Sequence, residues 1–224
     1  MFIEAGLLGT ATTLLASVAA GLVLAAALAT APWRTWLADP ERRWVWLAGL
    51  LLLCGLWSMR AGLTPGLSLR FLLITALALL HGWELAVIGG ALVLLALGLA
   101  GVADWASFGP NLLCSVSVPA LFTAWLHEQV HRRLPLNYFV YFFVTVFLGS
   151  VLAYNLAGLA RLGLLALDGT VPLEQVAAEY LPWLPFMSFG EGVANGMLMA
   201  MAVVYRPRWV MSFDDRQYLA RKDE

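Results

Sequence analysis

The chain has 224 residues, of which 62% are hydrophobic and 12% are charged, and its formal net charge is −1. An ordinary soluble domain carries roughly 25% charged residues, so this composition excludes an ordinary soluble protein. It predicts an all-α, polytopic integral membrane protein. The thirteen basic residues form no run, so we expect no nucleic acid as a partner.

Seven apolar stretches follow one another along the chain. Each is long enough, or nearly so, to cross a hydrocarbon core of about 30 Å, which takes a helix of about 20 residues. Prolines separate several of the stretches, and the third and fourth are short enough that they could be tilted. The sequence therefore predicts about seven transmembrane helices, at 6–31, 44–60, 66–80, 84–101, 112–130, 137–166 and 183–205.

The positions of the basic residues predict an orientation, because cytoplasmic loops of membrane proteins are enriched in Arg and Lys. With the N-terminus outside and the C-terminus cytoplasmic, the outer loops keep only Arg60. Arg161 lies within the sixth span, where it either snorkels to the outer interface or joins other interior polar residues. The cytoplasmic basic residues are then Arg34, Arg42, Arg43, Arg132, Arg133, Arg206, Arg208, Arg216, Arg221 and Lys222.

This orientation divides the chain into a transmembrane helical bundle at 1–205 and a cytoplasmic C-terminal tail at 206–224. We expect a multi-pass membrane protein, with membrane lipid as its surroundings. Small residues recur every fourth position in the first span, and such a stripe lets another helix approach closely. The stripe serves either packing within this chain or docking of a partner subunit, and comprises Ala5, Gly9, Thr13, Ser17, Gly21, Ala25 and Ala29.

A His-Glu-Gln-Val-His motif at residues 127–131 matches the H-E-x-x-H pattern. On a helix, His127 and His131 share one face and could hold Zn²⁺, with Glu128 as a general base. Leu167–Gly169 reads Leu-Asp-Gly and resembles the segment that supplies the third ligand in intramembrane metalloproteases. However, about 30 helical residues separate the two motifs, or roughly 45 Å of helical rise. This separation favours a solvated cluster of His and Arg at the membrane interface over a zinc site.

Polar residues inside apolar spans form the stronger candidate site, because ionisable groups in a membrane usually face the bundle interior in pairs. Arg70 lies in the third span, Glu191 lies in the last span, and Asn111 follows a Gly-Pro turn before the fifth. Either these residues form a substrate site, or Arg70 and Glu191 form a structural ion pair. The candidate substrate-binding residues are Arg70, Asn111 and Glu191, with Glu4 and Asn195 as weaker members.

The order of these features resembles the CbiM/NikM-like membrane subunit that captures substrate in energy-coupling-factor importers for cobalt and nickel. The segment 66–70, Gly-Leu-Ser-Leu-Arg, is similar to that family's Gly-Thr-Ser-Val-His, and Gly109-Pro-Asn111 is similar to its Gly-Ala-Asn. Glu191-Gly192 in the last span is similar to its Glu-Gly. The segment 205–219 resembles a bacterial branch grouped with these permeases, so the resemblance covers most of the chain. It implies a multi-pass protein of a bacterial plasma (inner) membrane.

Two positions depart from the family pattern. The family's Met-His-Ile-Pro start is Met-Phe-Ile here, with Phe2 in place of the His, and the His of Ser-Val-His is Arg70. Both imidazole ligands that the resemblance implies are therefore absent, and a guanidinium cannot ligate a metal. Arg70 would instead suit a substrate that bears a carboxylate or phosphate, or an internal pairing. Candidate ligands for a transition-metal ion are Met1, Glu4 and Glu191, and less favoured His127 and His131.

We therefore expect a permease or substrate-binding subunit of an ABC-type energy-coupling-factor importer, and not an enzyme. The chain contains no Gly-x-x-x-x-Gly-Lys-Ser/Thr pattern for ATP hydrolysis. The resemblance implies a transmembrane coupling subunit and cytoplasmic ATPase subunits as partners. No cofactor is expected beyond a transition-metal ion as candidate substrate. The alternatives are a zinc-dependent intramembrane enzyme that uses the motif at 127–131 and a structural membrane subunit without a ligand of its own.

Overall fold

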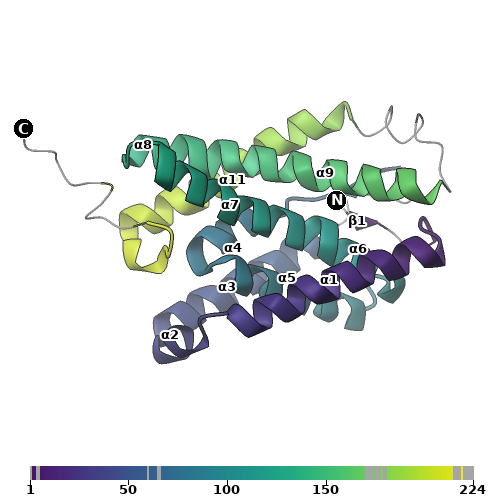
Figure 1. The fold of residues 1–224 in the computed structure, drawn as a ribbon, viewed down its shortest axis with the longest axis horizontal. Helices are drawn as coiled ribbons and strands as arrows, with labels where there is room; N and C mark the ends of the chain where they lie inside the picture. Colours follow the sequence, from purple (N-terminus) through teal and green to yellow (C-terminus); the bar gives the residue numbers. More distant parts are fainter. Residues whose placement is uncertain are drawn as a thin grey trace, which may run out of the picture.

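Figure 1 shows the computed structural model of the chain, an elongated bundle of helices. The structure describes residues 2–3, 6–59, 61–64, 67–169, 174, 178, 181–213 and 218. Helices make up nearly all of its regular structure, which confirms the predicted all-α class. A helix satisfies every interior backbone group by itself, so an apolar chain adopts it readily in lipid.

The first half of the chain alternates long and short helices. Asp39 shows how one of them begins: its carboxylate accepts the amide hydrogens of Glu41 and Arg42, and Pro40 fills the first helical position. The helices of this half are α1 (Thr10–Thr30), α2 (Trp33–Ala38), α3 (Pro40–Ser58), α4 (Ile74–His81) and α5 (Trp83–Leu99).

The second half contains two long compound helices and one uninterrupted helix. Each compound helix includes a wider π-helical stretch, η2 or η3, and Pro119, which lacks an amide hydrogen, closely follows η2. The first compound helix joins η1 (Trp105–Ser107), α6 (Phe108–Asn111), η2 (Leu112–Ser117) and α7 (Val118–Arg133). The second joins α8 (Tyr138–Val140), η3 (Tyr141–Leu148) and α9 (Gly149–Asp168), and α11 (Trp183–Tyr205) with η4 (Pro207–Trp209) ends the bundle.

A small antiparallel sheet corrects the prediction of a helical span at 66–80. Its strands are β1 (Phe2–Ile3), β2 (Ala61–Thr64) and β3 (Leu67–Leu69), in the order β1-β3-β2. Phe2 pairs with Ser68, so the beginning of the chain fixes a segment more than sixty residues away. Only α4 remains helical here, and its eight residues rise only about 12 Å. The apolar run predicted a span, but a non-local strand pairing decides its conformation.

Within the described residues, four helical stretches are long and apolar enough to cross a membrane, and α5 is a shorter apolar helix. The predicted count of seven helical spans is not confirmed among the described residues, since the third predicted span is part strand and part short helix. The orientation across the bilayer stays a prediction. The four stretches are Thr10–Thr30, Trp105–Arg133, Tyr138–Asp168 and Trp183–Tyr205.

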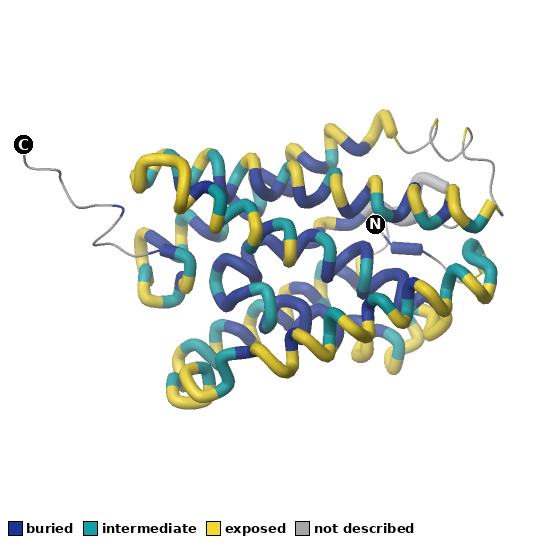
Figure 2. The backbone as a smooth tube through the Cα atoms, in the orientation of Figure 1, coloured by how far each residue is buried: buried dark blue, intermediate teal, exposed yellow. Residues whose placement is uncertain are grey.

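The core of the bundle lies around α4 and α5, which are buried along most of their length (Figure 2). By contrast, in the most apolar 18-residue stretch of α1 only 17% of the residues are buried. The bundle has two distinct ends (Figure 1): β1 and the start of α1 lie at one, here called the strand end. The helices α2 and α8 and the last described residues lie at the other, here called the tail end.

Candidate functional site

The first strand of the chain is folded into the bundle at the strand end. Phe2 and Ile3 are only 5% and 2% exposed. The side chain of Asn111, at the end of α6, pairs with Ile3 as a neighbouring strand would. Its Oδ1 accepts the Ile3 amide hydrogen at 2.8 Å, and its Nδ2 donates to the Ile3 carbonyl at 2.9 Å. Asn111 thus satisfies two buried backbone groups and holds the strand in place.

Positions 2 and 70 lie face to face inside the same region. The Cζ atom of Arg70 lies 4.7 Å from the centre of the Phe2 ring, a cation–π contact. The guanidinium also donates to the carbonyl of Trp57, whose indole packs edge-on against the Phe2 ring at 5.1 Å. Arg70 therefore directly follows β3 and points inward, whereas the sequence predicted that it lies within a helical span. These are the two positions at which the family resemblance implies imidazoles.

Glu191 and Asn195 of α11 hold the start of α4. The two carboxylate oxygens of Glu191 accept the amide hydrogens of Leu72 and Leu73, at 2.8 and 2.6 Å. Asn195 accepts the amide hydrogen of Ala76 at 2.7 Å and donates to Glu191 at 3.0 Å. These amides have no intrahelical acceptor, because the chain changes here from strand to helix. The structure assigns the Glu191 carboxylate to them, not to an ion pair with Arg70.

The turn that receives these hydrogen bonds has an unusual backbone. Leu73 has a φ of 52°, and among the described residues it is the only non-glycine residue with a positive φ. This left-handed conformation costs an L-residue about 1–2 kcal/mol. A negatively charged acceptor beside the first turn of α4 compensates, since it satisfies the free amides and interacts favourably with the helix dipole. The sequence contained no local signal for this turn.

Of the two alternatives for Arg161 of α9, snorkelling to the outer interface and an interior position, the structure shows the interior one. Its side chain is fully buried, with 0% exposed, and its Nη2 donates to the hydroxyl of Ser115 in η2 at 3.0 Å. Asn155, on the same helix, donates to the carbonyl of Val151 one turn earlier. The interior polar residues therefore form separate contacts, and Ser115 was not identified from the sequence.

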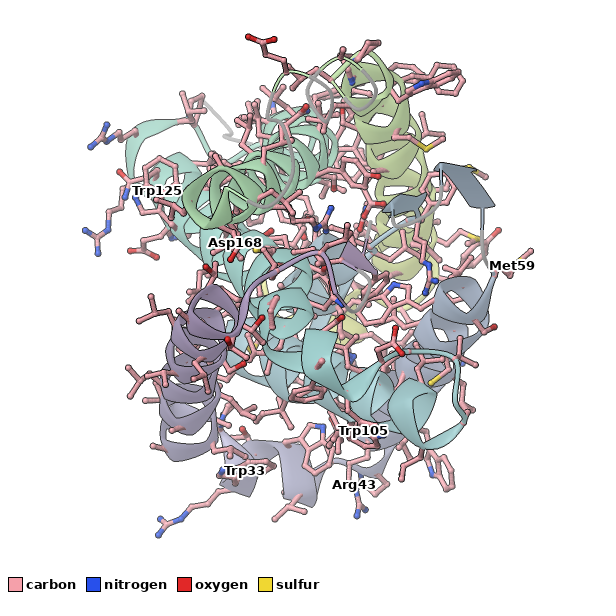
Figure 3. All side chains as sticks on the ribbon, turned by 90° about the vertical axis from the view of Figure 1, so that its right-hand side faces the viewer. Trp33, Arg43, Met59, Trp105, Trp125 and Asp168 are labelled. Carbon is pink, nitrogen blue, oxygen red and sulfur yellow. The ribbon has the colours of Figure 1, made fainter. Side chains whose placement is uncertain are left out.

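The histidine motif on α7 lies apart from the strand end. Glu128 is exposed and pairs with Arg132 of the same helix, while the rings of His127 and His131 lie 6.1 Å apart. Asp168 lies at the strand end, far from this motif, and accepts the amide hydrogen of Gly9 at the start of α1 (Figure 3). In the part of the chain that the structure describes, no three His, Cys, Asp or Glu residues are grouped to hold a metal ion.

Two of the candidate metal ligands, Met1 and Glu4, lie outside the described residues. Of the other candidates, Asn111, Glu191 and Asn195 all lie in the bundle interior, as expected. Each of the three side chains holds backbone groups of the strand end or of α4. The arrangement therefore positions the N-terminal strand and the broken segment from β3 to α4 against one another.

The long apolar helices place this chain in the class of helical membrane proteins. Its N-terminal strand is folded into the helical bundle. A family model described as "Cobalt uptake substrate-specific transmembrane region" (CbiM) matches residues 2–209. The chain therefore belongs to the CbiM family, which confirms the resemblance found in its motifs.

A solved structure has the same fold. It is titled "Crystal Structure of an Truncated Transition metal Transporter", with a TM-score of 0.73 and 18% sequence identity. The match covers 92% of this chain and 99% of that chain. Identity at this level shows a shared fold and no more. Among curated proteins, none matches the chain.

Proposed function

We propose that this chain is the membrane permease subunit of an importer and captures a transition-metal cation as its substrate. The family match and the fold shared with a transition metal transporter support this proposal. The observation that carries it is the burial of the N-terminal strand against Arg70 and Asn111. A substrate site at the strand end would be built from the beginning of the chain and the segment between β3 and α4.

The proposed site binds a cation without imidazoles. Phe2 and Arg70 supply no metal ligand, so the proposed ligands are the amine of Met1 and the carboxylates of Glu4 and Glu191. Oε2 of Glu191 accepts one backbone amide and has a second lone pair for a cation, whereas Oε1 accepts hydrogen bonds from both Leu73 and Asn195. Because Arg70 carries a fixed positive charge nearby, we propose that this cation site is weak.

The chain is proposed to cross the membrane seven times, with the N-terminus outside and the C-terminus in the cytoplasm. The third crossing would be the broken segment 67–81, a strand, a bend and the short helix α4. Non-helical backbone is tolerated at membrane depth where it is buried in protein, and the bend here is buried and bonded to Glu191. The basic residues of the tail end would then face the cytoplasm.

The proposed partners are a transmembrane coupling subunit and cytoplasmic ATPase subunits. Half of the small-residue stripe of α1 packs within this chain, where Ser17 lies against Gly109 and Gly9 against Asp168. The other half is exposed, at Gly21, Ala25 and Ala29. We propose this open half as the docking face, because small residues let a second helix approach closely.

Elemental analysis of the purified protein after exposure to Co²⁺, Ni²⁺, Cu²⁺ and Zn²⁺ tests the proposal. We expect retained metal to be lost in Glu4→Gln and in Glu191→Gln and kept in the matched control Glu128→Gln. Uptake of the same cation by cells that express the chain with its importer subunits should follow the same order. Metal lost only in Glu128→Gln would transfer the site to α7 and favour the zinc enzyme. Wild-type protein that retains no cation would contradict the proposed substrate.

A further inference from the structure

Two hollows meet at the tail end of the bundle, between α3, α4 and α11. The larger, of about 460 Å³, is lined by apolar side chains of these three helices, among them Ala48, Leu73 and Leu198. The smaller, of about 330 Å³, is lined by Glu41 and residues 205–209. The two are neighbours, because Tyr205, Arg206 and Trp209 line both of them.

The surface around residues 205–209, which borders both hollows and is here called the mouth, is basic. Arg206 and Arg208 are exposed, and Arg42 is half-buried and donates to the carbonyl of Arg208 at 3.4 Å. The one acid in the lining, Glu41, accepts a hydrogen bond from the indole of Trp209 at 2.8 Å. An apolar hollow beside a cationic surface and an interfacial tryptophan complements an amphiphile with an acyl chain and an anionic head group.

We propose that one anionic phospholipid occupies this site, with an acyl chain in the apolar hollow and its phosphate at Arg206 and Arg208. The larger hollow, at about 460 Å³, falls within the roughly 300–1,000 Å³ of ligand pockets. The charge at the mouth selects an anionic lipid over a zwitterionic one. The surrounding bilayer supplies this ligand, so the site is independent of the cation site at the strand end.

The lipid would contact the same turn that Glu191 and Asn195 hold. Leu73 and Ala76 line the apolar hollow, and their amide hydrogens are bonded to those two side chains. An acyl chain packed on this turn therefore stabilises the broken segment. The expected consequence is that anionic lipid raises the thermal stability of the purified protein.

The preference for an anionic head group can be tested by native mass spectrometry of the delipidated full chain. The protein is titrated with phosphatidylglycerol or with phosphatidylcholine of identical acyl chains. We expect phosphatidylglycerol to bind more tightly than phosphatidylcholine, and Arg206→Gln with Arg208→Gln to weaken its binding by about thirtyfold. The matched control is Arg132→Gln with Arg133→Gln, which removes two charges from the same end of the bundle and should leave binding unchanged. Equal binding of the two lipids, or equal loss in the two double variants, overturns the proposal.

Ala48→Phe tests the acyl-chain part, because Ala48 lines the apolar hollow and is exposed, so a larger side chain can fill it. We expect this variant to lose both lipids and the lipid-dependent stabilisation, while its lipid-free thermal unfolding matches the wild type. Undiminished lipid binding in Ala48→Phe overturns the proposal. Weakened association with a coexpressed coupling subunit, with lipid binding unchanged, would identify the hollow as a protein interface and would also overturn it.

Discussion

Glu191 lies in the bundle interior with only 1% of its side chain exposed. An ionisable residue in a membrane-spanning helix is by default a candidate functional residue. Its contacts give it a second role, since both oxygens accept backbone amides and Asn195 donates a third hydrogen bond. Burial of the carboxylate is offset by these bonds. One residue can therefore support the backbone and still present a lone pair of Oε2 to a substrate.

Glu191→Gln tests the supporting role through the stability of the protein. The amide group of Gln offers one acceptor oxygen where the carboxylate offers two, so one amide of Leu72 or Leu73 loses its partner. We expect a loss of about 1–3 kcal/mol in the free energy of unfolding. Thermal unfolding in detergent should show a fall in Tm of about 2–4 °C for each kcal/mol. Glu128→Gln, on the surface, should change Tm little, and an unchanged Tm in Glu191→Gln would show that the carboxylate does not hold this turn.

The contact between Phe2 and Arg70 permits a gain-of-function experiment. Because the two side chains face one another, Phe2→His combined with Arg70→His places two imidazoles together and removes the fixed positive charge. We expect the double variant to retain more Co²⁺ or Ni²⁺ than either single variant, as measured by elemental analysis. The experiment uses a His127→Ala background, which removes the natural histidine pair of α7. Metal retention no higher than in the single variants would count against a cation site at the strand end.

At the scale of elements, α4 is held at both ends by α11 and the segment that follows it. Glu191 and Asn195 satisfy its first amides. The amides of Met211 and Ser212 donate to the carbonyls of Leu80 and Leu79, at 3.1 and 3.2 Å, near its last turn. The described part of the C-terminal segment thus packs on the bundle and completes the capping of a helix too short to be stable alone.

The two halves of α1 are expected to respond differently to mutation. A methyl group on Gly109 would lie 2.6 Å from the Cα atom of Ser17, whereas one on Gly21 would meet no atom within 4 Å. We expect Gly109→Ala to cost about 1–3 kcal/mol through overpacking, as measured by thermal unfolding. Gly21→Leu should leave unfolding unchanged but reduce copurification with the proposed coupling subunit. If Gly21→Leu copurifies normally, the open half of α1 is not the docking face.

At the scale of the whole molecule, the proposed topology can be measured by labelling of single cysteines. In a background without Cys54 and Cys114, Leu167→Cys marks the strand end and Arg133→Cys marks the tail end. We expect a membrane-impermeant thiol reagent to label the first variant in intact cells and the second only in inverted vesicles. If the reagent labels both variants from the same side, residues 133 and 167 are not separated by an odd number of membrane crossings. If it labels Arg133→Cys in intact cells and Leu167→Cys only in inverted vesicles, the orientation is opposite to the proposed one.

The predicted spans agree with the structure where local composition decides the conformation. The last predicted span, 183–205, coincides with α11 (Trp183–Tyr205), and the first, 6–31, contains α1 (Thr10–Thr30). The third failed, because the pairing of Phe2 with Ser68 joins segments that no local pattern relates. The candidate site was predicted in part: Asn111, Glu191 and Asn195 lie in the interior as expected, but their backbone partners follow from the bend at Leu73 and could not be predicted.

The sequence by itself determined the class of protein, the all-α fold and the approximate extent of the long helices, because apolar run length and charge placement are matched to a bilayer. Its motifs also indicated the family. Only the tertiary structure decided that the third apolar run is strand, bend and short helix, and that Arg70 packs on Phe2. It alone placed Glu191 on backbone amides and formed the hollow beside α4. These features depend on which distant backbone groups need a partner once the helices are packed together.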